Sequence, residues 1–302
     1  MEVVKINLEC NGCLIAMKKY NIMKNKIATC LWFDGKAKEA ATFYCSVFKD
    51  ANITAENPLV TAFEASGYQF ICLNGGPDFK FNPSISFYIV FEDENEIDEV
   101  WKKLSLGGNV LMPLNKYDWS EKYGWVQDKF GVTWQLSFGK LSDVGQVFTP
   151  SLMFVGDQYG KAKDAINHYT AIFKNSVVDG ILPYGKDEAP DVEGAVKHAQ
   201  FSLNGNKFMV MESNHPHNFS FNEAISLVVK CDNQSEIDYF WEKLTEGGKE
   251  SNCGWLKDKF GVSWQIVPTV LEELMSNPEK SERVTQAFLK MKKFDIEKLK
   301  QA

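Results

Sequence analysis

The chain contains two diverged copies of one sequence, and this repeat constrains its fold more than any other feature. Residues 79–91 read FKFNPSISFYIVF and residues 219–231 read FSFNEAISLVVKC, at an offset of 140. Further on, GWVQDKFGVTWQL (124–136) matches GWLKDKFGVSWQI (254–266), at an offset of 130. Matches in the same order across more than a hundred residues indicate a tandem duplication. The first copy carries ten extra residues, within LMPLNKYDWSEKY (111–123).

Each copy predicts the same order of helices and strands. A short strand opens it, at 28–33 and 152–155. The helix that follows in the first copy has apolar residues on one face, at Ala37, Ala40, Tyr44, Val47 and Phe48. Strict alternation predicts a half-buried strand through Ile85, Phe87, Ile89 and Phe91. A second helix is predicted from Ile97, Val100, Trp101 and Leu104, and further strands at 68–73, 132–138 and 207–211.

This order of elements predicts an α+β protein of two tandem modules, joined by a short linker. We expect a flexible N-terminal extension over 1–25, a first module over 26–140 and a second over 150–268. Gly, Ser and Pro cluster between 139 and 150, as is typical of a linker. A C-terminal helical segment is predicted over 269–302, with one helix of mixed charge over 281–294.

Composition excludes several classes of function. The net charge of −7 is spread along the chain, so no basic patch predicts binding to nucleic acid or to an anionic membrane. No apolar run approaches the roughly 20 residues that a membrane-spanning helix needs. Charges flank the apolar patch at 14–17, which argues against a signal peptide, and Met17 or Met23 could equally be the start.

The cysteines predict a reducing compartment. The seven cysteines are odd in number and mostly lie in apolar stretches, so we expect buried thiols in a cytoplasmic protein. Cys10 and Cys13 form a lone CxxC. A tetrahedral zinc site needs four ligands, and the sequence near them supplies no second pair.

Polar residues share one face of the predicted strands. In the closing strands, Gln135 and Gln265 point away from the apolar set, and in the middle strands Ser86 and Ser226 do the same. If helices cover the apolar face, the opposite curved face carries Gln135 with Ser86 and Gln265 with Ser226. This arrangement predicts a ligand pocket with apolar walls and a few polar groups. The alternative is that these residues only form hydrogen bonds across the sheet.

Several segments resemble the PhnB-like branch of the vicinal-oxygen-chelate superfamily, which includes glyoxalases and bleomycin-resistance proteins. They are CLWFDGKAKEAATFY (30–44), Asn74 to Gly76, FNPSISF (81–87), EIDEVWKKL (96–104), GWLKDKFGVSWQIVP (254–268) and LKMKKFDIEKL (289–299). The resemblance covers nearly everything from residue 26 onward. Such proteins are often labelled demethylubiquinone methyltransferases, but the sequence has no glycine-rich loop of the kind that cradles a nucleotide-like cofactor.

The resemblance implies paired βαβββ units that form curved mixed sheets, with helices on the convex face, around a small-molecule site. Metal enzymes of the superfamily hold a divalent ion there with His, Glu or Gln. The closing-strand ligand position falls on Gln135 and Gln265, and the opening-strand histidine position falls near Thr29 or Cys30 and near Pro150 or Ser151. Divalent ions favour charged oxygen or imidazole donors, so we expect neither a metal nor another cofactor.

The leading hypothesis is a small-molecule-binding protein, with metal-independent catalysis in the pocket left open. Ser86, Trp125 and Gln135 would orient the ligand in one copy, and Ser226, Trp255 and Gln265 in the other. An acid–base step would fall on His198 or Glu212, the ionisable groups on candidate pocket strands. The alternatives are sequestration of a ligand without turnover, and a metal-dependent lyase or dioxygenase.

Two expectations concern larger parts of the chain. The two modules are expected to pair within the chain, which leaves a monomer or a homodimer open. Tyr117 and Trp119 lie in the ten-residue insertion of the first copy, which could form either a lid over one pocket or a packed surface loop.

Overall fold

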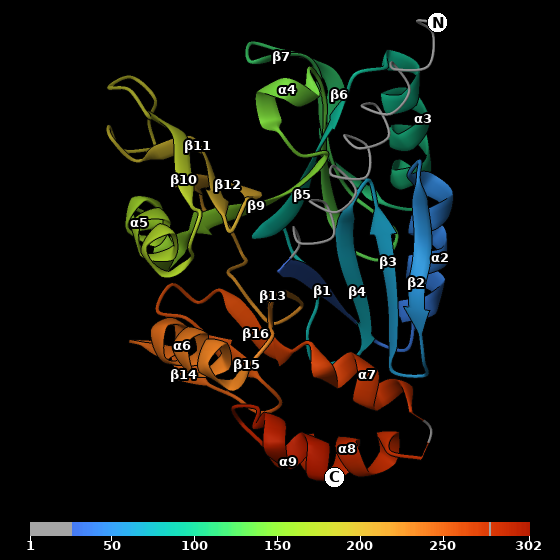
Figure 1. Ribbon diagram of the computed structural model, residues 1–302. Coiled ribbons are helices and arrows are strands. Elements are labelled where there is room, and N and C mark those ends of the chain that lie inside the picture. Colours follow the sequence, from blue (N-terminus) through green and yellow to red (C-terminus); the bar gives the residue numbers. More distant parts are fainter. Residues whose placement is uncertain (1–25, 278) are drawn as a thin grey trace, which may run out of the picture.

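The computed structural model describes residues 26–277 and 279–302, so the expected N-terminal extension, with Cys10 and Cys13, lies outside the described residues. The described part folds into two curved sheets flanked by helices (Figure 1). The first copy forms β1 (Ile27–Phe33), α2 (Ala37–Val47), β2 (Ala51–Glu56), β3 (Val60–Ala65), β4 (Tyr68–Asn74), β5 (Ile85–Phe91), α3 (Glu94–Ser105), β6 (Asn109–Tyr117), β7 (Ser120–Gln127) and β8 (Thr133–Phe138). After α4 (Leu141–Val144), the second copy forms β9 (Phe148–Val155), α5 (Ala162–Ile172), β10 (Val177–Pro183), β11 (Val196–Leu203), β12 (Asn206–Ser213), β13 (Ile225–Cys231), α6 (Gln234–Thr245), β14 (Lys249–Glu250), β15 (Trp255–Lys257) and β16 (Ser263–Pro268). The chain ends with α7 (Val270–Ser276), α8 (Ser281–Phe288) and α9 (Ile296–Gln301).

The two copies exchange halves, so neither sheet is made by one copy. Sheet A has the strand order β14-β15-β16-β13-β1-β4-β3-β2, and sheet B has the order β10-β11-β12-β9-β5-β8-β7-β6. Two antiparallel junctions join the halves. Cys30 of β1 lies opposite Ser226 of β13, and Ser86 of β5 lies opposite Ser151 of β9. Modules therefore pair within the chain, and each sheet is a composite of both sequence repeats.

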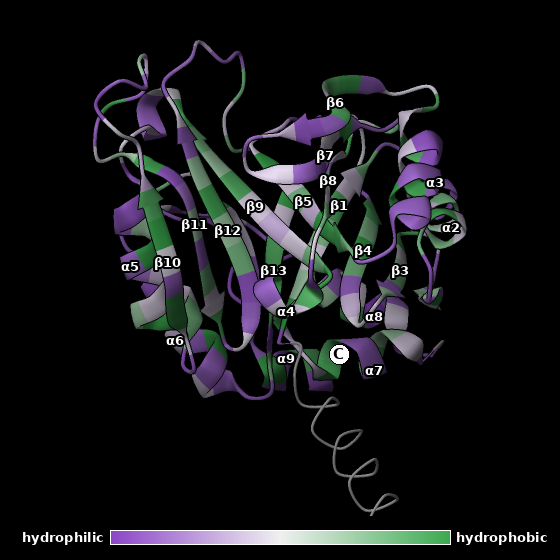
Figure 2. Ribbon diagram, turned by 90° about the horizontal axis from the view of Figure 1, so that it is seen from above, coloured by the Kyte–Doolittle hydropathy of each residue, from purple (hydrophilic) through white to green (hydrophobic). Residues whose placement is uncertain are grey.

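Alternation along the strands decides which face is covered. In β5, Ile85, Phe87 and Ile89 are buried in the main core, whereas Ser86 and Tyr88 point to the other face. Helices α2, α3, α5 and α6 lie on the core side of the sheets. We call the opposite side of each sheet its concave face. Figure 2 shows α3 mostly in the purple of hydrophilic residues, because its apolar side chains turn inward onto the sheet.

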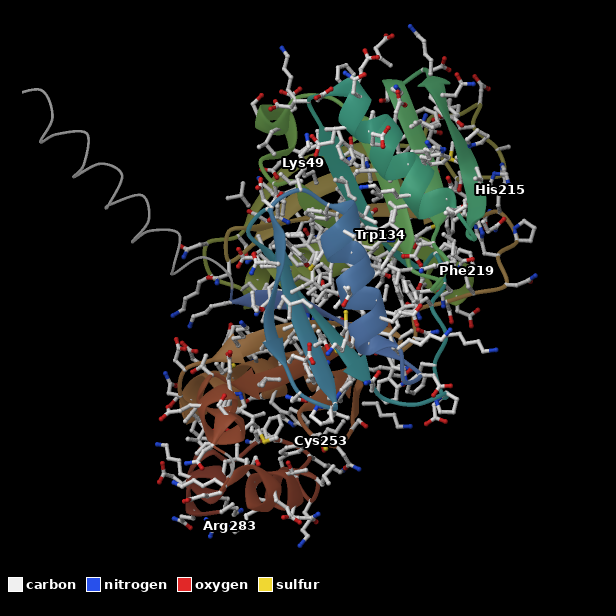
Figure 3. The ribbon with its side chains drawn as sticks, turned by 90° about the vertical axis from the view of Figure 1, so that its right-hand side faces the viewer. Lys49, Trp134, His215, Phe219, Cys253 and Arg283 are labelled. Carbon is white, nitrogen blue, oxygen red and sulfur yellow. The ribbon has the colours of Figure 1, made fainter. Side chains whose placement is uncertain are left out.

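One hydrophobic core runs through both sheets and their helices. Trp134 of β8 lies at its centre, in contact with the rings of Tyr44, Phe70 and Phe87, which come from three other elements (Figure 3). Burying a large apolar side chain stabilises a fold by roughly 1.5–3 kcal/mol, so this contiguous core holds the exchanged halves together.

The prediction of a single helix over 281–294 is wrong. Helix α8 ends at Phe288, and α9 begins at Ile296. Between them, the carbonyls of Met291 and Lys292 accept hydrogen bonds from the backbone of the β14–β15 turn, at 2.7 Å each, so they cannot continue a helical ladder. Within the described residues, no helix is both long and apolar enough to cross a bilayer.

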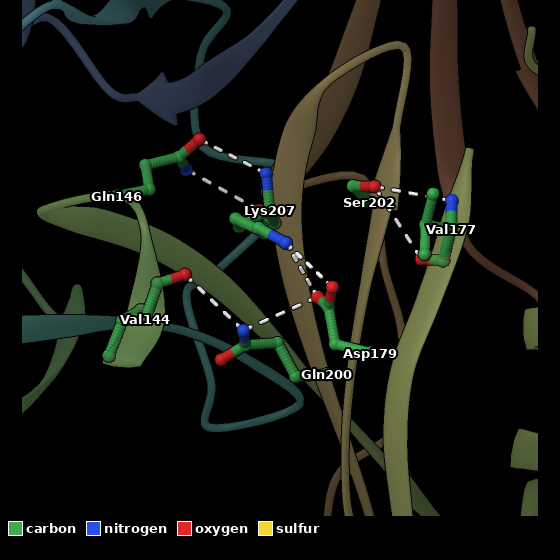
Figure 4. Close-up of polar contacts among 7 residues, drawn as sticks. All are labelled: Val144, Gln146, Val177, Asp179, Gln200, Ser202 and Lys207. Carbon is green, nitrogen blue, oxygen red and sulfur yellow. Dashed lines mark hydrogen bonds and ion pairs between the residues drawn. The ribbon is translucent and has the colours of Figure 1, made fainter. Parts of the chain in front are cut away.

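The predicted linker is also more ordered than its composition indicates. It contains the short helix α4, and strand β9 already begins at Phe148. Gln146 fixes this segment to sheet B, since its Oε1 accepts from the backbone N–H of Lys207 at 3.0 Å (Figure 4). Gln200 Nε2 donates to the carbonyl of Val144 at 3.3 Å. The linker is therefore bound to the concave face of sheet B.

Candidate functional site

The structure brings together the two predicted polar pairs, one on each concave face. On sheet A, Gln265 Nε2 donates to Ser226 Oγ at 2.9 Å. On sheet B, Gln135 Nε2 donates to Ser86 Oγ at 2.7 Å. Because the halves are exchanged, each pair faces an opening strand from the other copy, which places Cys30 beside Ser226 and Ser151 beside Ser86.

Sheet A contains a cavity of about 660 Å³, between its concave face and the C-terminal helices. This volume is within the range of small-molecule sites, roughly 300–1,000 Å³. Apolar and aromatic side chains make up most of its wall: Trp32, Leu59, Val60, Ile71, Leu73, Phe79, Val228, Trp255, Leu256, Val267, Leu271, Phe288, Leu289 and Phe294. Of the predicted ligand-binding residues, Trp255 and Gln265 line the cavity directly.

Two tryptophans from different copies form the aromatic end of this cavity. The rings of Trp32 and Trp255 meet edge to face, with centroids 5.8 Å apart, and Phe79 lies 5.1 Å from Trp32. Trp32 Nε1 donates to the carbonyl of Gly76 at 2.8 Å, which fixes the orientation of the indole. Trp32 is not among the predicted ligand-binding residues, because it reaches this cavity only through the pairing of β1 with a strand of the other copy.

The polar groups behind Gln265 are neutral. Ser226 is fully buried, and the Cys30 thiol lies against Ser226 and Gln265. Burial raises the pKa of Cys30 to about 11, against a smaller lowering by hydrogen bonds from Gln265 and Ser226. This thiol is therefore protonated at neutral pH and is a poor nucleophile and a poor metal ligand.

Most of the charged groups at the cavity form ion pairs. Lys257 binds Glu223 at 2.9 Å, and Lys292 binds Glu250 at 3.4 Å. Glu250 also accepts a hydrogen bond from Trp241 Nε1 at 3.0 Å. The thiol of Cys253 lies between the sheet and the C-terminal helices (Figure 3), where burial raises its pKa. These partners leave the Gln265 amide as the main polar group that faces the apolar space.

On sheet B, the equivalent position is filled by the protein itself. Tyr123 of β7 donates its hydroxyl to Gln135 Oε1 at 2.7 Å, and its ring is buried. Tyr117 and Trp119 stack with centroids 5.0 Å apart and both contact Tyr123. The ten-residue insertion thus forms the β6–β7 hairpin. The indole Nε1 of Trp125 is buried without a hydrogen-bond partner among the described residues.

The linker closes the other part of this concave face. Val144 of α4 packs with Val90 and Met209. Lys207 binds Asp179 at 2.7 Å, and Gln200 bridges Asp179 to the linker (Figure 4). The structure therefore brings together Ser86, Trp125 and Gln135. The side chain of Tyr123 already occupies the space beside them.

The two candidate acid–base residues do not meet the glutamines. His198 lies on β11 of sheet B, which three strands separate from β8, and burial lowers its pKa. Glu212 shares the core-facing side of β12 with Phe208 and Val210. Its Oε1 accepts from the backbone N–H of Ala162 at 2.9 Å, at the start of α5, and its Oε2 accepts from Val196. The expectation that Glu212 faces the pocket is wrong, since it caps a helix on the other side of the sheet.

The donor atoms at the polar pairs do not fit a divalent ion. Sheet A offers the Gln265 amide, the Ser226 hydroxyl and a thiol held in its protonated form. Sheet B offers an amide whose oxygen is already bound to Tyr123, with two serine hydroxyls. Divalent ions favour carboxylate, imidazole or thiolate ligands, and no cluster of three such side chains occurs in the described residues.

The exchanged βαβββ halves, with a polar pair on each concave face, give the chain a glyoxalase-like fold in tandem form. A family model described as 3-demethylubiquinone-9 3-methyltransferase matches residues 25–137 and 146–267. The chain belongs to this family, whose members include PhnB-like proteins. A search of curated proteins finds no match.

Some of the solved structures that match the chain cover about a third of it, and others cover most of it. A Bacillus cereus PhnB protein, described as a 3-demethylubiquinone-9 3-methyltransferase, is 38% identical over 37% of this chain and 98% of its own, with a TM-score of 0.35. Glyoxalase I from Zea mays is 13% identical over 86% of this chain and 99% of its own, with a TM-score of 0.50. A glyoxalase-related enzyme from Fulvimarina pelagi is 15% identical over 36% of this chain and 86% of its own, with a TM-score of 0.29.

Proposed function

We propose that this protein binds one uncharged, planar, largely apolar small molecule per chain, without a metal ion, in the cavity of sheet A. The observation that carries this proposal is the 660 Å³ cavity, with mostly apolar and aromatic walls and the neutral amide of Gln265 on its sheet side. An apolar wall supplies affinity through burial, and one polar group supplies orientation. Gln265, Ser226, Trp255 and Trp32 are the residues that hold the ligand, and the equivalent group on sheet B has a structural role.

Binding is better supported than acid–base catalysis. The carboxylates at the cavity are engaged with lysines, and burial keeps the two nearby thiols protonated. A general base must instead be free to accept a proton from the ligand. The family description names a methyl transfer, but the cavity supplies no polar cradle for a nucleotide-like methyl donor, so sequestration without turnover is favoured.

Fluorescence titration with N-phenyl-1-naphthylamine tests this proposal. This neutral, planar dye brightens when it leaves water for an apolar site. We expect one dye per chain, and we expect Val228→Trp to weaken binding about tenfold or more by filling the cavity, a change of roughly 1.4 kcal/mol. Val178→Trp is the matched control, because it adds the same side chain to the exposed edge strand β10.

The same preparation tests the metal-dependent alternative. A metal ion at a hundred times its dissociation constant would stabilise the chelator-treated protein by about 2.7 kcal/mol, and would raise its melting temperature by several degrees. We expect no such shift with divalent metals. A shift that disappears in Gln265→Ala would replace the proposal with a metal site. Equal dye binding by Val228→Trp and the unmodified chain would place the ligand outside this cavity.

A further inference from the structure

The two concave faces carry the same polar pair in the same register. On sheet A, Trp255 lies opposite Gln265, and on sheet B, Trp125 lies opposite Gln135. Each glutamine amide donates to the serine of the neighbouring middle strand, at 2.9 Å and 2.7 Å. The two amides are therefore equivalent in position and orientation. A group that contacts the Gln135 amide indicates which kind of ligand could contact the Gln265 amide.

On sheet B, a phenol ring occupies the space in front of the amide. The Tyr123 hydroxyl donates to Gln135 Oε1 at 2.7 Å. The rings of Tyr117 and Trp119 hold the Tyr123 ring in edge-to-face contacts, at 5.8 and 5.9 Å. This arrangement has the form of a bound ligand: an aromatic ring between aromatic walls, with one hydroxyl on the amide oxygen.

On sheet A, no tyrosine of the described residues fills that space. The repeat aligns Tyr123 with Cys253, which lies in the turn before β15 with a φ of 57°. Its backbone N–H donates to the carbonyl of Met291 at 2.7 Å, and its thiol contacts the carbonyl of Phe288 at 3.7 Å. Cys253 is thereby turned toward the C-terminal helices. Gln265 lines the cavity, its Nε2 donates to Ser226 at 2.9 Å, and its amide also lies against the Cys30 thiol. Among the described residues, no tyrosine hydroxyl bonds to it as Tyr123 does to Gln135.

We propose that the sheet A cavity takes a neutral hydroxylated aromatic molecule, a phenol or its fused-ring equivalent, whose hydroxyl donates to Gln265 Oε1 as Tyr123 does to Gln135. This inference rests on the proposed function and specifies its ligand class. The ring lies against Trp32 and Trp255, and the hydroxyl donates to the amide oxygen from the cavity side. A phenolate would place its negative oxygen against the amide oxygen, so only the protonated form binds well.

Competition with the dye tests the donor requirement. 2-Naphthol and 2-methoxynaphthalene share a fused ring, but only the naphthol can donate a hydrogen bond. We expect 2-naphthol to displace N-phenyl-1-naphthylamine from the unmodified chain with about five- to tenfold higher affinity, the effect of one net hydrogen bond in an apolar site. Gln265→Leu removes the acceptor at similar volume and should equalise the two compounds. Tyr123→Phe, a change confined to sheet B, should leave the preference intact.

A second variant provides the reciprocal test. Tyr123→Ala vacates the ring space in front of Gln135, so calorimetry with 2-naphthol should detect two sites per chain instead of one. If neither naphthalene displaces the dye and the dye itself does not bind, the proposed function fails, and this inference with it. If both compounds bind equally to the unmodified chain, the cavity stands and the phenol inference is overturned. If Gln265→Leu does not fold, the second site created by Tyr123→Ala provides the test instead. If that site binds 2-naphthol no more tightly than 2-methoxynaphthalene, the inference is overturned.

Discussion

Each sequence repeat places one buried carboxylate at the centre of its packing. Asp258 accepts four hydrogen bonds: from the hydroxyl of Tyr169 at 2.6 Å, from Trp264 Nε1 at 2.8 Å, and from the backbone N–H groups of Phe260 and Val262 at 2.9 and 3.1 Å. Asp128 has the same set of donors in the first copy. The repeated DKFGV sequence is thus a structural centre, which explains its similarity in the two copies without a role in binding.

Removing one donor should destabilise the fold in a pH-dependent manner. Burial raises the pKa of Asp258 from 3.8 to about 6, against weaker lowering by its hydrogen bonds. A raised folded-state pKa means that the stabilisation is complete below about pH 4 and is lost as the pH rises through 6. We expect Tyr169→Phe to lower the free energy of unfolding by about 2 kcal/mol at pH 7.5, where the carboxylate is charged, and by less at pH 5. Urea unfolding at both pH values measures this difference.

Tyr123→Phe is the matched control for that measurement. It also removes a buried tyrosine hydroxyl, but the partner is the neutral amide of Gln135. The loss in free energy of unfolding caused by Tyr123→Phe should therefore be the same at pH 5 and pH 7.5. Equal losses at both pH values for Tyr169→Phe would show that Asp258 does not change its charge in this range.

The alternation of apolar and polar residues along the strands correctly predicted which polar residues would pair. It gave the wrong face for Glu212, whose position depends on a contact with a helix. Gln135 with Ser86 and Gln265 with Ser226 follow from alternation alone. Glu212 was placed on the wrong face because its strand was read without its partner helix. The register shows that it takes the role of Asn74, whose Oδ1 accepts from the first N–H of α2. A comparison of strand ends between the copies could have found this signal.

At the scale of elements, the C-terminal helices are part of the sheet A cavity. Phe288 of α8 lines it, together with Leu289 and Phe294 of the α8–α9 connection, although all three come from a segment predicted only as a helical extension. Backbone bonds from Cys253 and Gly254 fasten this segment to the β14–β15 turn. The shorter hairpin of the second copy leaves room for these helices, whereas in the first copy the ten extra residues extend the hairpin and bring Tyr123 over Gln135.

Gly254 is the contact where this docking can be tested. A Cβ at Gly254 would lie 2.5 Å from Phe294 Cε2 and 2.7 Å from the carbonyl oxygen of Ile266, and its φ is 79°. We expect Gly254→Ala to displace the C-terminal helices and to weaken dye binding. Backbone strain and overpacking together should lower the free energy of unfolding by about 2–4 kcal/mol. Thermal melting and the dye titration measure the two effects.

Gly160→Ala separates strain from crowding. Gly160 has a φ of 82°, close to that of Gly254, but a Cβ there meets nothing within 4 Å. Gly160→Ala should lower the free energy of unfolding by only about 1 kcal/mol and leave dye affinity unchanged. If the two variants bind the dye equally well, the C-terminal helices do not determine the cavity.

At the scale of the whole molecule, the exchange of halves could not be predicted from the repeat. The repeat indicates two equal units, but it does not indicate whether β1 pairs with a strand of its own copy or of the other, because β5 and β13 have matching sequences. The family resemblance implied the paired units. Trp32 entered the site only through this exchange, because β1 of the first copy pairs with β13 of the second, which in turn pairs with β16. The candidate site is thus a product of the duplication and belongs to neither copy.

A single copy should consequently seek a partner. Residues 26–140 contain the β1–β4 half of sheet A and the β5–β8 half of sheet B, which do not pair with each other in the full chain. In a separate fragment, the edges of β1 and β5 would lack their strand partners β13 and β9. Two fragments can restore two sheets if β1 of each pairs with β5 of the other, with Cys30 opposite Ser86 in place of Ser226.

We therefore expect the 26–140 fragment to be a folded homodimer at micromolar concentration, as measured by light scattering together with circular dichroism. Ser86→Pro removes a backbone donor at the centre of the junction strand, so this variant fragment should be monomeric and largely unfolded. A well-folded monomer of the unmodified fragment would contradict the argument. It would mean that β5 can turn back onto β1 of the same copy, and that the exchange depends on the linker and α4 rather than on the pairing preferences of the strands themselves.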